Sequence, residues 1–171
     1  MKPITFAPIG HIRSAHRFAE ETPIQPVYAA DCLGTAELLP EYADGLADIE
    51  GFSHVYLIYH LHAAPAPQLR VRPFLQDREH GIFATRAPSR PNPIGMSLVR
   101  LLRREGAVLH LAGVDILNGT PLLDLKPYAP RYDAVESPRG GWTEDLSAAE
   151  AWRLGRRGFR PGAPSPFSPT V

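Results

Sequence analysis

Residues 81–97 read Gly81-Ile-Phe-Ala-Thr-Arg-Ala-Pro-Ser-Arg-Pro-Asn-Pro-Ile-Gly-Met-Ser97, a stretch in which a proline-rich loop joins two apolar runs. Proline fixes its own φ angle and pushes the residue before it toward extended geometry. The three closely spaced prolines, Pro88, Pro91 and Pro93, therefore predict a stiff loop between two strands of a β fold.

Three polar residues of this loop, Arg86, Arg90 and Asn92, carry many hydrogen-bond donors on a backbone that loses little entropy on binding. A recognition loop is one interpretation of this pattern. An ordinary proline-rich turn is the other, and composition alone favours neither.

The composition places limits on the function. The chain has 171 residues, 44% of them hydrophobic, which suits one domain with a real core. Eighteen basic residues balance 18 acidic ones, which argues against nonspecific nucleic-acid binding over the whole surface and leaves room for local basic patches. A single cysteine, Cys32, excludes an intrachain disulfide and a cysteine-rich zinc site. The chain shows no cleavable leader and no apolar run of about 18 residues, so we expect a soluble cytoplasmic protein with no membrane partner.

The hydrophobic patterning predicts a mainly all-β protein. Residues 52–62 are aromatic, β-branched and apolar almost throughout, which is typical of a central buried strand. A hairpin is expected from 94–103 and 107–117, and Asn118-Gly119 is a strong turn signal. Further short strands are predicted at 6–13, 34–39, 69–74, 81–86 and 122–128. Short strands at regular spacing favour a β-barrel or a β-sandwich.

Helices are expected at 41–49 and 144–157, the second with Ser147 as its N-cap and Glu150 at the capping-box position. The tail from Pro161 is rich in proline and serine and predicts irregular structure. We therefore divide the chain into a main domain, 1–135, and a C-terminal helix and tail, 136–171.

Two groups of residues could carry chemistry. Period-two alternation places Asp124, Lys126 and Tyr128 on one strand face, where an acid, an amine and a phenol could handle protons; a solvated strand face is the commoner meaning. His60 and His62 could form half of a metal site, but no third ligand follows at a recognised spacing, so no metal is expected. Rossmann, P-loop and G-x-S-x-G signatures are missing.

Four blocks together resemble the TsaA-like (TrmO-type) family of tRNA methyltransferases. They are residues 9–14, 51–54, 83–97 and 115–128, and they occur in the family order over roughly residues 5–133. The block Arg90-Pro-Asn-Pro-Ile-Gly95 with its flanks is far more specific than a short motif.

The resemblance implies a compact β-barrel with short helices, usually a homodimer, that binds S-adenosylmethionine and methylates N6 of threonylcarbamoyladenosine beside the anticodon of a tRNA. Carried over to this chain, the implied cofactor-binding residues are Gln25, Pro26, His62, Ala63, Arg86, Thr120, Pro121, Leu122, Leu123 and Asp124. Relatives often carry arginine before the Gln-Pro pair, where this chain has Ile24, and larger members continue into a C-terminal domain that helps to bind tRNA.

These residues lead to a mechanistic hypothesis. Asp124 is the first candidate for a general base, with Tyr128 orienting it and Lys126 supplying positive charge. Arg90 and Asn92 are expected to contact the substrate. Local contacts to tRNA are expected from Arg70, Arg72, Arg78, Arg103, Arg104 and the C-terminal arginines 153, 156, 157 and 160. The alternative function is a non-catalytic barrel that binds S-adenosylmethionine or a nucleotide as a sensor, or that binds RNA only.

Overall fold

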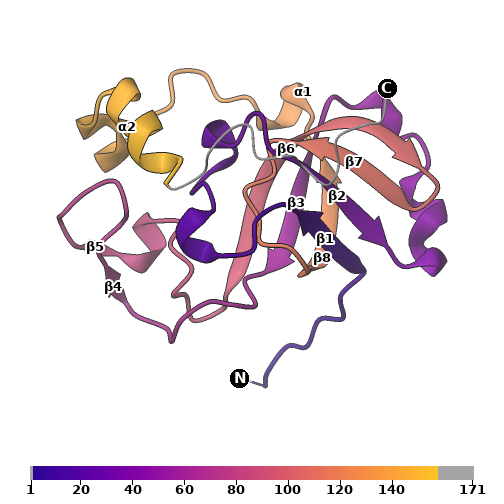
Figure 1. Ribbon diagram of the computed structural model, residues 1–171, viewed down its shortest axis with the longest axis horizontal. Helices are drawn as coiled ribbons and strands as arrows, with labels where there is room; N and C mark the ends of the chain where they lie inside the picture. The colour runs from indigo at the N-terminus through magenta and orange to yellow at the C-terminus, as the bar shows by residue number, and fades with distance from the viewer. Residues whose placement is uncertain (1, 158–171) are drawn as a thin grey trace.

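The computed structural model describes residues 2–157, and six antiparallel strands in it close a barrel in the order β1-β2-β7-β6-β3-β8 (Figure 1). These strands are β1 Gly10–Ser14, β2 Leu33–Leu38, β3 His54–His60, β6 Ile94–Glu105, β7 Val108–Ala112 and β8 Thr120–Pro127. Two further strands, β4 Arg70–Val71 and β5 His80–Gly81, pair in a small separate sheet. The prediction of a mainly β barrel is confirmed.

Strand β3 lies between β6 and β8; it pairs with β6 along its whole length and with β8 from Val55 to Tyr59. Its alternate residues Val55, Leu57 and Tyr59 are buried in the barrel, as expected from its apolar run. Strands β1, β2, β6, β7 and β8 add the other strand residues of the core, which are Ile12, Ala36, Val99, Leu101, Leu109, Leu111 and Leu122. The prediction of a central buried strand at 52–62 is confirmed over His54–His60.

Helices are short. Between residues 2 and 157, six are 3-10 turns: Ala19–Glu21, Pro26–Tyr28, Pro40–Leu46, Ile49–Gly51, Ile82–Ala84 and Gly141–Asp145. Two are α-helices, α1 Pro130–Asp133 and α2 Ala148–Gly155. Ser147 caps α2 as predicted, because its Oγ accepts a hydrogen bond from the Glu150 amide at 3.3 Å. The helix predicted at 144–157 is shorter than expected, and Arg160 with the proline-rich tail lies outside the described residues.

Three strand predictions need correction. The first strand begins at Gly10 rather than at residue 6, and the strand predicted at 107–117 ends at Ala112, just before Gly113 turns the chain with a φ of +85°. Residues 82–84 form a 3-10 turn instead of a strand. There the Thr85 amide donates back to the Ile82 carbonyl at 3.1 Å, which curls the chain before the proline loop begins.

One end of the barrel carries the longer connections. Strand β3 ends there and β6 and β8 begin there, so segments 61–64, 82–93 and 113–119 meet at this end. The C-terminal segment extends over it: the Ile24 amide donates to the Gly155 carbonyl at 2.9 Å, and Trp142 Nε1 donates to the Ala84 carbonyl at 2.8 Å. Figure 1 shows α2, β4 and β5 together on this side of the molecule.

Within residues 2–157, no helix has both the length and the apolar character that a membrane crossing requires.

Candidate functional site

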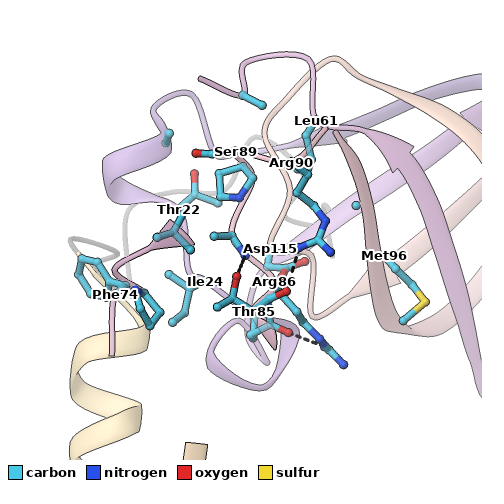
Figure 2. Close-up of a pocket in the computed structure, with 18 of the residues that line it drawn as sticks. Thr22, Ile24, Leu61, Phe74, Thr85, Arg86, Ser89, Arg90, Met96 and Asp115 are labelled. Atoms are coloured by element: carbon cyan, nitrogen blue, oxygen red, sulfur yellow. Dashed lines mark hydrogen bonds between the residues drawn. The ribbon is translucent and has the colours of Figure 1, made fainter. Parts of the chain in front are cut away.

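A cavity of about 1160 Å³ opens at this end of the barrel. Its wall combines the 3-10 region near Gln25, the end of β3, the proline loop, the start of β6 and the segment before β8. Figure 2 shows Arg86, Arg90 and Asp115 gathered in the middle of this site, with Phe74 on one side and Met96 on the other. Charged groups of both signs therefore face a cavity whose wall mixes polar and apolar side chains.

Main-chain hydrogen bonds connect the proline-rich loop, residues 85–93, to the segment that follows β3. The Leu61 amide donates to the Pro93 carbonyl at 2.7 Å, and the Gln68 amide donates to the Ser89 carbonyl at 3.0 Å. Arg90 braces the loop from inside, because its Nη1 donates to the carbonyls of Ile82 at 3.1 Å and Thr85 at 2.8 Å. The stiffness predicted from the prolines is thus reinforced by contacts between distant segments.

Arg86 and Gln25 meet across the cavity although 61 residues separate them. Arg86 Nη1 donates to Gln25 Oε1 at 2.6 Å, which fixes the direction of the guanidinium. A guanidinium has five N–H donors, so this one bond leaves the planar fork available to a carboxylate or a phosphate.

His62 and Thr120 also meet at the cavity wall. Thr120 Oγ1 donates its only proton to the Leu117 carbonyl at 2.7 Å. Because that proton is used, His62 Nδ1 is the donor in the 3.3 Å hydrogen bond between His62 and Thr120 Oγ1. In the neutral ring, Nε2 is then an acceptor. Thr120 follows the Asn118-Gly119 turn, where Gly119 has a φ of +80°, as the turn signal predicted.

The sequence reasoning missed a buried polar chain on the cavity wall. Ser97 Oγ donates to Asp115 Oδ1 at 2.7 Å and lies 3.0 Å from the Tyr59 hydroxyl. Since the Ser97 proton points to Asp115, Tyr59 donates to Ser97, and the donor chain ends on the carboxyl group. Desolvation by burial is the largest effect on Asp115 and raises its pKa to about 7; the hydrogen bond from Ser97 opposes the shift. Burial likewise raises the pKa of Tyr59, so the phenol is neutral at pH 7.

The raised pKa of Asp115 predicts how the stability of the folded protein changes with pH. Between the ordinary carboxyl pKa and about 7, the folded protein binds a proton at this site that the unfolded chain has lost, so stability falls as the pH rises through this window. Asp115→Asn removes this effect. We expect the variant to be more stable than the wild type at pH 8 by on the order of 2 kcal/mol, with little difference near pH 4. Urea unfolding at both pH values measures this, and an equal difference at both would contradict it.

The face of Asp124, Lys126 and Tyr128 lies on the outside of the barrel. Lys126 Nζ is 2.8 Å from Asp124 Oδ2, and the Tyr128 ring contacts the Tyr56 ring edge-on at 6.0 Å. A register shift between Ile58 and the next residue of β3 resets the alternation of β8, so Leu122 points into the core while Asp124 points outward. A second depression of about 340 Å³ lies on this face, and Met96 lines both it and the larger cavity.

The structure brings together part of the set expected from sequence. The cavity is lined by Gln25, His62, Ala63, Arg86, Arg90 and Thr120. Among residues 2–157, the cavity wall does not include Pro26, Asn92, Pro121, Leu122, Leu123, Asp124, Lys126 or Tyr128. Leu122 is fully buried in the barrel core, and Pro26 begins the 3-10 turn that follows Gln25.

The histidine pair is separated by the end of a strand. His60 is the last residue of β3, and His62 lies in the turn after it, so the two do not share a strand face as expected. Over the part of the chain that the structure describes, no three His, Cys, Asp or Glu side chains are grouped as metal ligands.

The comparisons with known proteins all point to the same family. A family model described as the tRNA-methyltransferase O N-terminal domain matches residues 11–134. A Pyrococcus abyssi protein named "Probable S-adenosyl-L-methionine-binding protein" is 52% identical over 141 residues, which cover 82% of this chain and 77% of that protein. The tRNA (adenine(37)-N6)-methyltransferase of Escherichia coli is 32% identical over 160 residues, or 88% of this chain and 68% of the enzyme.

A solved structure is similar as well. The crystal structure of TrmO from Pseudomonas aeruginosa matches with a TM-score of 0.70 and 41% identity. The match covers 84% of this chain and 63% of the crystallised one, so this chain spans less than two thirds of that protein. The family model covers the barrel strands almost entirely and most of the residues that line the cavity.

Proposed function

Since this chain belongs to the family of the tRNA-methyltransferase O N-terminal domain, we propose that it transfers a methyl group from S-adenosylmethionine to N6 of an adenosine beside a tRNA anticodon. The observation that carries this proposal is the cavity at the barrel end, most of which is built from the matched region and which holds Arg86 and Asp115 together. When bound, S-adenosylmethionine supplies an electrophilic methyl group on a sulfonium.

The cavity fits such a cofactor chemically. The amino-acid end of S-adenosylmethionine carries a carboxylate, which suits the guanidinium of Arg86 held by Gln25. His62 and Thr120 offer polar groups on the same wall, and Leu61 and Met96 offer apolar surface for a ring. We therefore propose Gln25, His62, Ala63, Arg86 and Thr120 as the cofactor-binding residues, with 1–135 as the cofactor domain and 136–171 as an appendage.

The outer face beside the cavity is our candidate for proton handling. Methyl transfer needs the acceptor nitrogen to be aligned and its proton removed, and N6 of a carbamoylated adenine is a weak nucleophile. Asp124 is proposed as the base, with Lys126 and Tyr128 positioning it and Arg90 and Asn92 serving the substrate. Support comes from the Asp124–Lys126 ion pair and from Met96, which joins this face to the cavity.

Asp124→Asn is accordingly expected to lower kcat by about 100-fold or more, since a positioned base contributes about that much, while the Kd of S-adenosylmethionine changes little. Single-turnover methyl transfer and isothermal titration calorimetry measure the two quantities. Asp44→Asn, at an exposed position in the Pro40–Leu46 turn, is the matched control. Unchanged turnover in Asp124→Asn would remove Asp124 from the base role.

Binding of tRNA is proposed to use a local basic patch near the cavity mouth. Several arginines are already engaged: Arg103 is paired with Glu105, Arg156 with Asp31, and Arg104 donates to the Leu46 carbonyl at 3.0 Å. Arg72 is exposed, lines the cavity and makes no ion pair with any residue of 2–157.

Arg72→Ala should therefore weaken tRNA binding and reduce the slope of log K against log salt by about 1, the value for one phosphate contact. Arg103→Ala, which removes an exposed arginine on β6 that lies outside the cavity, should change the slope less. Filter binding across a salt series measures both, and equal slopes in the two variants would contradict the placement of the patch.

The assembly is proposed to be a homodimer in the cytoplasm, where a tRNA substrate would be met. Exposed apolar side chains outside the cavity, such as Leu102 on β6 and Tyr132 in α1, support a surface for contact between two copies. Light scattering of the purified protein tests the oligomer.

The direct test of the function is incubation with labelled S-adenosylmethionine and tRNA carrying threonylcarbamoyladenosine. Transfer of label to that tRNA, and not to the same tRNA lacking the modification, is the expected result. Binding of the cofactor without any transfer would instead favour a non-catalytic sensor or RNA-binding barrel.

A further inference from the structure

We propose that Asp115 is the residue that binds the positively charged ammonium group of S-adenosylmethionine, so that Arg86 and Asp115 together recognise the two charges of its amino-acid end. This inference rests on the proposed function, because it assigns a further binding residue to the same cavity. Block 115–128 of the family resemblance begins at Asp115, but the implied cofactor-binding residues do not include it, and strand alternation does not point to it.

The first support is geometric. Asp115 lines the cavity together with Arg86, and Figure 2 shows the two residues near each other. The Tyr59–Ser97 donor chain holds one carboxyl oxygen, Oδ1, and so fixes the orientation of the group. Within residues 2–157 no side chain donates to the other oxygen, Oδ2; the backbone amide of Asp115 also bonds to its own carboxyl group, and a ligand donor would use the acceptor capacity that remains.

The second support is the charge balance around the carboxyl group. No lysine, arginine or histidine of residues 2–157 forms an ion pair with Asp115, and Arg86 acts on it only at longer range. Arg86 itself is directed to Gln25. A partly buried carboxylate without a cation is unfavourable in the free protein, and an ammonium group would remove that penalty.

Apart from the Arg86 guanidinium, which is directed to Gln25, three titratable groups lie near Asp115, namely Cys32, Tyr59 and His16, and all three are neutral at pH 7. Burial raises the pKa of the Cys32 thiol to about 12 and also raises that of Tyr59. His16 is bonded to the Val114 carbonyl at 2.9 Å, and burial lowers its pKa, which keeps the imidazole uncharged. The cation that pairs with Asp115 is therefore expected to come from the ligand.

An ammonium group is favoured over a ribose hydroxyl by this arrangement. A hydroxyl would satisfy the hydrogen-bonding capacity of Oδ2 but would leave the negative charge of Asp115 unbalanced in a partly buried site. The amino-acid end of the cofactor offers both signs of charge at a short spacing, and the cavity presents both complementary signs on one wall.

The test compares two ligands by calorimetry. S-adenosylmethionine carries the ammonium and carboxylate, whereas 5′-methylthioadenosine has the same nucleoside without either. Asp115→Asn keeps the acceptor for Ser97 and removes the charge. We expect it to weaken S-adenosylmethionine binding by about tenfold or more, and to leave 5′-methylthioadenosine within about twofold of the wild type. Asp44→Asn controls for general loss of charge, and circular dichroism verifies that each variant is folded.

A pH series provides the second readout. From about pH 5.5 to about pH 7, where the ligand ammonium stays protonated, wild-type affinity for S-adenosylmethionine should rise several-fold as Asp115 ionises. The Asp115→Asn variant should show a flat profile, and 5′-methylthioadenosine should show a flat profile with both proteins.

Three outcomes would overturn the inference: unchanged S-adenosylmethionine affinity in Asp115→Asn, an equal loss for both ligands, or a wild-type pH profile that the variant retains. A wild-type protein that binds no S-adenosylmethionine would be a different failure, because it would contradict the proposed function itself.

Discussion

Gly95→Ala is expected to lower the free energy of unfolding by about 3 kcal/mol, the upper range for overpacking a core. Gly95 on β6 is paired with Tyr59 on β3. A Cβ atom at this position would lie 2.5 Å from Cζ of Tyr59 and closer still to Cε2, distances at which something must move. The Tyr59 ring is only 7% exposed and its hydroxyl is bonded to Ser97, so it has little freedom to give way.

The same substitution should also disturb the cavity. Displacing the Tyr59 ring breaks the donor chain that ends on Asp115, so Gly95→Ala should bind S-adenosylmethionine more weakly even where it remains folded. Urea unfolding and calorimetry measure the two effects. Gly45→Ala is the control, because a Cβ there would meet nothing within 4 Å. If both alanine variants were as stable as the wild type, the close packing of β3 against β6 would be wrong.

Arg86→Ala is expected to weaken S-adenosylmethionine binding by between about tenfold and about 100-fold, the loss typical of a charge-assisted hydrogen bond. The reason is that Arg86 presents a guanidinium fork directed by Gln25 into the cavity. Arg86→Lys should recover only part of the affinity, because an ammonium keeps the charge without the fork.

Two controls define the result for Arg86. Gln25→Ala should have a smaller effect, since it removes only the group that orients the guanidinium. Arg103→Ala should bind as the wild type does, because Arg103 lies outside the cavity and pairs with Glu105. Calorimetry with S-adenosylmethionine measures all four variants, and wild-type affinity in Arg86→Ala would exclude this residue from the cofactor site.

Local patterns predicted several strands well because strands have a short period, but they left a barrel and a sandwich open, and the family resemblance implied the barrel. The apolar run that ends at His60 and the hairpin formed by β6 and β7 were both visible as alternation and turn signals. The same logic failed at residues 82–84. There the apolar residues Ile82 and Phe83 predict a strand, but the hydrogen bond from the Thr85 amide back to the Ile82 carbonyl forms a 3-10 turn.

The site was less predictable because its residues come from distant elements. Tyr59, Ser97 and Asp115 belong to β3, β6 and the segment before β8, and only the closed barrel brings their side chains into one chain of hydrogen bonds. The one feature of the sequence that could have pointed to this site was the serine within the apolar run of β6. The bulge opposite Ile58 could not be foreseen either, since it depends on the pairing of β3 with β8.

The central claim, methyl transfer to a modified adenosine in tRNA, is tested most directly by mass spectrometry of tRNA nucleosides from cells that lack this gene. We expect methylated threonylcarbamoyladenosine to disappear and the unmethylated nucleoside to accumulate, and we expect the wild-type gene to restore methylation while Arg86→Ala does so poorly. Unchanged levels of the methylated nucleoside in the deletion strain would contradict methyl transfer by this protein.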